Sequence, residues 1–213
     1  MINIAFLFSG SGSLISSVID LCNTENSNCS LKLIISNNKK VSSNNIDCPD
    51  DAEFHVLDHF NYHSRREHED AIEKLLVKHK IDLIVLGGYR RIFTAEFVSK
   101  FGTMTINTHP SILPSFPGDK AQKSAIEYGV RCSGATVHFI NNEVDQGPII
   151  AQSVIEVKIG VTESELRRKI TETEKHLIPL AIRLIASEKI EYDGEKIIYK
   201  SNISESLLYV DLS

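Results

Sequence analysis

The hydrophobic positions of the chain fall into short apolar runs that alternate with segments of helical spacing. Ile2–Phe8 is an almost unbroken apolar run that stops at the Gly/Ser segment Ser9–Ser13, after which apolar residues recur at helical spacing. This order is typical of a strand, a glycine loop and a helix. Further apolar runs predict strands near 31–35, 54–57, 82–86, 104–107, 135–140 and 149–157.

Helix starts are marked by two capping boxes. Ser64-Arg65-Arg66-Glu67 predicts a helix from about Ser64 to His79, and Thr162-Glu163-Ser164-Glu165 predicts a long helix that Pro179 should kink. Shorter helices are expected over 94–100 and 121–128, and Asp193-Gly194 predicts a two-residue hairpin. Residues 36–51 are polar and predict no element.

Strands that alternate with helices at this spacing predict an α/β fold. We expect a single Rossmann-like, doubly wound and mostly parallel sheet over residues 1–200, with a C-terminal helix and hairpin, and a tail over 201–213. We see no internal repeat and no linker.

Composition excludes several classes of protein. The 213 residues are 42% hydrophobic and 24% charged, and the net charge of −5 argues against nucleic acid or an anionic membrane as partner. Partners should be small molecules, and the chain a monomer or homodimer. The N-terminal apolar run has no basic flank or cleavage site and is too short to cross a bilayer, which predicts a cytoplasmic protein.

Cysteine and histidine spacings predict no metal site. The four cysteines form no C-x-x-C pair, so we expect reduced thiols. Most histidines lie in a hydrophilic stretch or on helix faces, without the H-E-x-x-H motif, and His55, His59 and His63, although four residues apart, do not lie in a predicted helix. The histidines of this group are His55, His59, His63, His68, His79 and His176.

The glycine loop after the first strand fits a single phosphate. Gly10-x-Gly12 lacks the third glycine of a dinucleotide fingerprint, and the lysine of a P-loop is missing. What remains is a set of backbone N–H groups around Gly12 and Ser13 at a helix start, which can hold a phosphate. A loop that only turns the chain is the alternative.

Candidate acid–base groups follow two later strands. Asn107 and His109 are two residues apart at the carboxyl end of a predicted strand, so they project to the same side. An amide and an imidazole can stabilise an oxyanion while a proton moves. Asp145, after the next strand, would raise the pKa of His109 if the two met; alone, each residue has an ordinary structural explanation.

Six segments, taken in order, resemble the folate-dependent formyltransferases, most closely those that act on phosphoribosylglycinamide in purine synthesis. The likeness covers nearly the whole chain. The segments are Ser9–Ser13, Leu83–Ile92, Asn107–Pro114, Phe116–Gly118, Thr136–Phe139 and Asp145–Ile150.

The resemblance implies roles for the matching residues. The substrate amine would attack the formyl carbon of 10-formyltetrahydrofolate, with Asn107, His109 and Asp145 as catalytic residues and no metal. Gly12, Ser13, Leu14 and Glu174 would bind the phosphate and ribose of the acceptor. The folate site would include Asn107 together with Arg65, Arg90, Arg91, Ile92, Phe93, Ile140, Asn141, Asn142, Glu143 and Val144.

Two departures keep other acceptors open. The family usually has Asn where this chain has Leu14, and a histidine near Pro117-Gly118 where this chain has Asp119–Gln122. One alternative is the same chemistry on another amine, such as an amino sugar or a hydroxylated amino acid. A second alternative is a folate-binding module without catalysis.

Overall fold

Contacts divide the chain into two compact units, Met1–Asn107 and Thr108–Ser213. The computed structural model describes residues 1–42, 46, 48–200 and 209–211. Strand β5 (Thr105–His109) is continuous through the boundary between the units.

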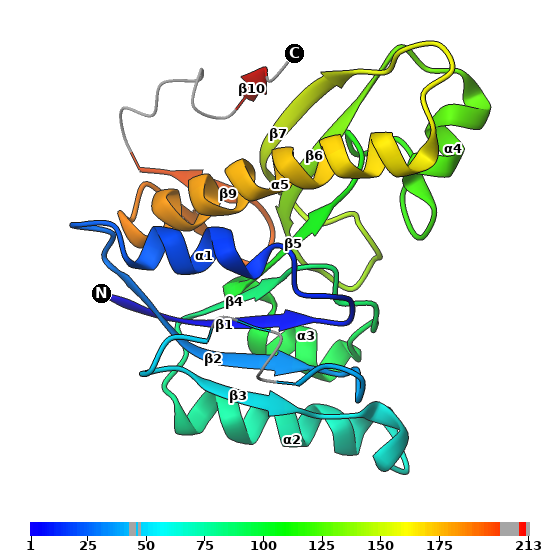
Figure 1. The fold of residues 1–213 in the computed structure, drawn as a ribbon. Helices are drawn as coiled ribbons and strands as arrows, with labels where there is room; N and C mark the ends of the chain where they lie inside the picture. The colour runs from blue at the N-terminus through cyan, green and yellow to red at the C-terminus, as the bar shows by residue number, and fades with distance from the viewer. Residues whose placement is uncertain (43–45, 47, 201–208, 212–213) are drawn as a thin grey trace. The chain divides into compact units, whose positions relative to one another are not determined.

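The first unit is built on parallel strands that follow the predicted apolar runs. They are ordered β5-β4-β1-β2-β3. Residues Ile4–Phe8 of β1 are fully buried, as expected of a parallel strand covered on both faces. The other strands of this unit are β2 (Cys29–Ser36), β3 (Glu53–Val56) and β4 (Leu83–Leu86) (Figure 1).

Helices cover this sheet on both sides. The strand order runs from β1 to β2 in one direction and returns to β4 on the other side of β1, so right-handed crossovers place α1 and α2 on opposite faces. Figure 1 shows the strands β1–β3 between these two helices. The helices are α1 (Ile15–Cys22), α2 (Arg65–Lys78) and α3 (Ala95–Phe101), with short 3₁₀ turns η2 (His59–Asn61) and η3 (Gly102–Met104).

The second unit combines an antiparallel pair with a long helix. β6 (Cys132–Phe139) pairs antiparallel with β7 (Ile149–Glu156), and β10 (Tyr209–Asp211) pairs parallel with β7. Helix α5 (Glu163–Ala186) packs against β6 and β7 through its apolar face. The remaining elements are α4 (Ala121–Tyr128), β8 (Ile190–Tyr192) and β9 (Ile197–Tyr199).

One local expectation turns out differently, and the kink expected at Pro179 stays a prediction. Helix α5 has the predicted capping box at Thr162, and it continues through Pro179 as one element. The predicted C-terminal hairpin is confirmed as β8–β9, but its two-residue loop is wrong, since Tyr192 pairs with Ile197 and the loop holds four residues. The cause is Asp193, whose Oδ1 accepts from the backbone N–H groups of Glu195 and Lys196 at 2.9 Å each and stabilises the wider turn.

The fold class is confirmed as a mostly parallel, Rossmann-like α/β fold with a C-terminal helix and hairpin. Within residues 36–51, the described positions contain no helix or further strand after β2 ends at Ser36; positions 43–45 and 47 lie outside them. The boundary between a domain over 1–200 and a tail over 201–213 stays a prediction. No helix among the described residues is long and apolar enough to span a membrane.

Candidate active site

The end of β5 brings His109 against Asp145 in the second unit. The Nδ1 atom of His109 lies 3.3 Å from Oδ2 of Asp145, and both side chains are more than nine-tenths buried. Neither spacing along the chain nor residue type could place these two groups together. The structure therefore joins two of the three residues expected to act on the formyl group.

Asp145 is held by a tightly folded turn. Its φ is 55°, a left-handed conformation, and its Oδ2 accepts a 2.7 Å hydrogen bond from the backbone N–H of Gly118. Gly147 follows in the same turn, and a Cβ added there would lie 1.7 Å from the carbonyl oxygen of Phe139. Only glycine fits that approach, so the turn that aims Asp145 depends on Gly147.

Both ring nitrogens of His109 face acceptors. Nε2 lies 2.8 Å from the carbonyl oxygen of Phe116, which can only accept, while Nδ1 faces the Asp145 carboxylate. The imidazole of His109 is thus held between a carbonyl oxygen and a carboxylate, with Nδ1 oriented toward Asp145.

His138 is a third member of this cluster that the sequence did not reveal. It lies on β6, almost fully buried, with Nδ1 2.8 Å from the carbonyl oxygen of Phe139 and Nε2 3.8 Å from Oδ1 of Asp145. Burial lowers the pKa of His138, although the Phe139 carbonyl and Asp145 oppose the shift. His138 therefore favours the neutral form beside Asp145.

Asn107 lies on the same strand as His109. The two residues are i and i+2 of β5, so their side chains point to the same side, with Cα atoms about 7 Å apart in an extended strand. Asn107 is half-buried and His109 is buried. The local geometry of one strand thus presents an amide and an imidazole side by side, as the sequence predicts.

Glu174 of α5 is buried beside β5. Its Oε1 accepts a 2.9 Å hydrogen bond from the hydroxyl of Thr108. Burial raises the pKa of Glu174 to about 7, against the opposing effect of the Thr108 hydroxyl. Near neutral pH this carboxyl therefore exists in both protonation states and can donate as well as accept. Thr108, its partner, was not predicted.

Replacing Glu174 by Gln should make the protein more stable at alkaline pH. A raised folded-state pKa contributes stability that is fully present below the ordinary pKa of glutamate and is lost as pH rises through about 7. Relative to the parent, the free energy of unfolding of Glu174→Gln should rise by up to roughly 3 kcal/mol as pH increases from about 4.5 through about 7, and the difference should then stay constant at higher pH; thermal unfolding across this range measures it. Glu172→Gln, an exposed change on α5, is the control. Parallel pH curves for Glu174→Gln and the parent would contradict the assignment.

The glycine loop lies in the first unit, at the carboxyl end of β1. Gly12 has φ of 75°, and a Cβ there would come within 3.1 Å of the Phe8 ring. Leu14 precedes α1 with its side chain buried, so that side chain faces the core and only backbone amides remain for a ligand. The loop borders a hollow of about 260 Å³ that Ile15, Ser16, Ile19, Asp20 and Ile46 also line.

The loop meets the end of β4, where the strand order of the unit reverses. Ser9 N–H donates to the carbonyl of Gly88 at 3.2 Å, and Arg90 N–H donates to the Ser9 hydroxyl at 2.8 Å. Gly87 is required here, since a Cβ would lie 2.1 Å from the Phe6 ring. This is the position at which open α/β sheets bind ligands.

The residues predicted for folate occur in both units. Arg65 begins α2 and Arg90–Phe93 follow β4, whereas Ile140–Val144 form the loop before Asp145. That loop is held by Asn141, whose Oδ1 accepts from Glu143 N–H at 3.0 Å and whose Nδ2 donates to the Gln146 carbonyl at 3.1 Å. Each segment is thus ordered locally, and their shared role stays a prediction.

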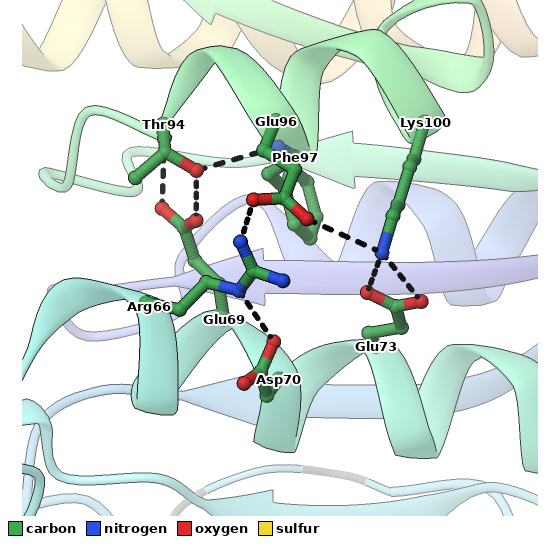
Figure 2. Close-up of a pocket in the computed structure, with 8 residues that line it drawn as sticks. All are labelled: Arg66, Glu69, Asp70, Glu73, Thr94, Glu96, Phe97 and Lys100. Carbon is green, nitrogen blue, oxygen red and sulfur yellow. Dashed lines mark hydrogen bonds and ion pairs between the residues drawn. The ribbon is translucent and has the colours of Figure 1, made fainter.

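The segment after Phe93 is fixed by polar contacts between α2 and α3. Figure 2 shows Thr94 bonded to Glu69, Arg66 paired with Glu96 and Asp70, and Lys100 paired with Glu73. The Phe93 ring stacks on Phe97 with centroids 4.1 Å apart. Because these groups satisfy one another, we interpret this cluster as structural support for residues 90–93.

A model of the family described as formyl transferase matches residues 2–182. The chain belongs to the formyl transferase family. The match includes Asn107, His109, Asp145 and Glu174, and it confirms the resemblance that the six sequence segments indicated.

Relatives within the formyl transferase family include both short and long proteins. Phosphoribosylglycinamide formyltransferase of Escherichia coli (strain K12) is 30% identical over 191 residues, 89% of each chain. Trifunctional purine biosynthetic protein adenosine-3 of Gallus gallus is 36% identical over 200 residues, 93% of this chain. This chain spans only about a fifth of that longer relative, at 20%.

The fold of this family member also matches solved structures. Glycinamide ribonucleotide transformylase 1 from Symbiobacterium toebii superposes with a TM-score of 0.86 at 33% identity, covering 94% of this chain and 95% of that one.

The sequence missed His138 and Thr108 because an isolated histidine or threonine on a strand has no spacing signal. Both residues lie in segments that carry the family resemblance, Asn107–Pro114 and Thr136–Phe139, and that was their only signal.

Proposed function

We propose that this chain transfers the formyl group of 10-formyltetrahydrofolate to the amine of 5'-phosphoribosylglycinamide. The observation that supports it best is the contact between His109 and Asp145. His109 lies on β5, the strand that also carries Asn107. The family match and the name of the Escherichia coli relative support this acceptor. Small-molecule substrates, a cytoplasmic location, a monomer or homodimer and no nucleic acid or membrane partner belong to the same proposal.

The reaction needs no nucleophile from the protein. The acceptor amine attacks the formyl carbon, and the carbonyl oxygen becomes an oxyanion that the Asn107 amide and the protonated His109 stabilise. The new C–N bond forms first and gives this tetrahedral oxyanion, whose collapse restores the carbonyl and breaks the bond from the formyl carbon to N10 of folate. The proton leaving the amine ends on N10, which releases tetrahydrofolate and the formylated amide. Asp145 holds His109 in its charged form while this occurs.

Phosphate and ribose recognition fall to the glycine loop and α5. Backbone N–H groups of Gly12, Ser13 and Leu14, at the start of α1, provide donors for a phosphate. Glu174, near its midpoint of titration at neutral pH, can accept from or donate to a ribose hydroxyl. Arg65, Arg90–Phe93 and Ile140–Val144 would contact folate, with the two arginines near Gly88 suited to its glutamate carboxylates.

An acceptor screen tests the proposed function. Tetrahydrofolate formation from 10-formyltetrahydrofolate should depend on 5'-phosphoribosylglycinamide, and mass spectrometry should find the formylated amide. Amino sugars linked to nucleotides and hydroxylated amino acids serve as competing acceptors. Turnover with one of these alone would assign another amine, formate release without acceptor would indicate hydrolysis, and folate binding without turnover would indicate a binding module.

Inorganic phosphate should compete with the acceptor and not with folate. Gly12→Ala should raise the KM of the acceptor by about tenfold, because alanine in a left-handed conformation costs roughly 1–2 kcal/mol and displaces the loop amides. Initial rates at several phosphate concentrations measure the first effect, and KM values for both substrates measure the second. Competition with folate alone would place the anion elsewhere.

A further inference from the structure

A cluster of metal-ligating side chains lies outside the candidate active site, at the edge of the first unit. It comprises Glu53, His55 and His79, whose ligand atoms all lie within 4.8 Å of one another. Glu53 and His55 alternate on β3, the edge strand, so they project to the same face. His79 is the C-cap of α2, and Figure 1 shows α2 running beside β3.

The distances in the cluster are those of a coordination sphere. Oε2 of Glu53 lies 3.0 Å from Nε2 of His55 and 3.2 Å from Nε2 of His79. Two ligands bound to zinc at about 2.05 Å with tetrahedral angles would be about 3.3 Å apart. Both distances are close to that value, and the two histidine nitrogens lie within 4.8 Å of each other, so a small rearrangement would admit an ion between the three groups.

His79 gives a second, independent indication. Its Nε2 atom is buried and has no hydrogen-bond partner in the part of the chain that the structure describes, although it faces the Glu53 carboxylate. A buried polar atom in this position is usually satisfied. The C-terminus of α2 also directs partial negative charge to this end of the helix, which favours a cation.

We propose that Glu53, His55 and His79 bind a divalent transition-metal ion of the zinc class, through one carboxylate oxygen and two imidazole nitrogens. Two histidines and a glutamate form a ligand set that zinc accepts, with water in the fourth position. Imidazole ligands exclude magnesium and calcium, which prefer oxygen. The ion would tie the start of β3 to the end of α2.

Lys78 is the competitor for this site. Its Nζ donates to both carboxylate oxygens of Glu53 at 2.9 Å each. Lys78, followed by His55, lowers the pKa of Glu53 to about 2, so the carboxylate is charged at any working pH. The ammonium also repels an incoming dication. Lys78→Met should therefore raise the affinity for the ion, a result that a site elsewhere would not give.

The experiment is a calorimetric titration of the metal-free full chain with ZnCl₂, repeated by visible spectroscopy with Co²⁺. We expect one equivalent to bind, with the intense bands of four-coordinate Co²⁺. His55→Gln and His79→Gln should each weaken zinc by at least about tenfold, since even outer partners of a metal change affinity by 10–100-fold. Lys78→Met should strengthen it, and bound zinc should raise the melting temperature.

Controls separate this site from other ligands. His63→Gln and His176→Gln remove exposed imidazoles, and Cys22→Ser removes the thiol that lies 3.6 Å from Cys29. These variants should bind zinc as the parent does. His55 lies on β3, the edge strand of the first unit. If His79→Gln does not fold, the zinc affinity of His55→Gln tests the proposal. No binding by the parent, or unchanged binding in His55→Gln, would overturn the proposal.

Discussion

Asp145→Asn should lower kcat by about a hundredfold or more while leaving the fold intact. The asparagine keeps an oxygen that can accept from Gly118 N–H, but it removes the charge that faces His109 at 3.3 Å. Without that charge His109 loses the group that favours its cation. The free energy lost is that of oxyanion stabilisation, so kcat should fall more than KM rises.

Steady-state rates with both proposed substrates measure this effect, and thermal unfolding checks the fold. Asp50→Asn, an exposed aspartate in the first unit, is the matched control and should leave kcat unchanged. A kcat within a few-fold of the parent would remove Asp145 from the reaction.

Much of the first unit could be predicted from the chain alone. Its strands are buried on both faces, so they appear as continuous apolar runs such as Ile4–Phe8, and Ser9–Ser13 marks the end of β1 unambiguously. The capping boxes place the starts of α2 and α5 because the bonds that cap a helix are local. Patterns that depend on neighbours in sequence are therefore reliable here.

One local turn and the contacts between distant residues could not be predicted from spacing. Asp193 bonds to backbone groups two and three residues later and widens the hairpin, although Asp-Gly alone is typical of a tight turn. His109, His138 and Asp145 come together only because β5, β6 and the loop that carries Asp145 bring them to the same place. Family resemblance indicated the first and last of these residues, whereas His138 had no distinguishing local pattern.

The cluster of Glu53, His55 and His79 illustrates the same limit. Glu-x-His on a strand and a histidine at the end of the following helix match no common metal motif, because the ligands come from two elements that pack side by side. The proposed site therefore has no local sequence signal, and the absence of a metal that spacing indicates stays a prediction.

His109→Gln should reduce kcat by at least about a hundredfold, the largest loss we expect from one substitution. Glutamine can still donate to an oxyanion from its amide, but it has no proton of suitable pKa to exchange with the reacting nitrogens. Folate binding should persist, since no predicted folate contact other than Asn107 lies on the same strand. Fluorescence or calorimetric titration with a folate analogue measures that binding, and His176→Gln is the control.

The double variant Asp145→Asn/His109→Gln decides whether the two residues act as one unit. If Asp145 acts by charging and orienting His109, its loss has no further effect once the imidazole is gone, and the double variant should be no slower than His109→Gln alone. If the two losses multiply, Asp145 has a separate task, such as relaying a proton through water. Asp145 also accepts a hydrogen bond from Gly118 N–H and faces His138. If the two losses in kcat multiply, these contacts are the ones through which a separate task of Asp145 would act.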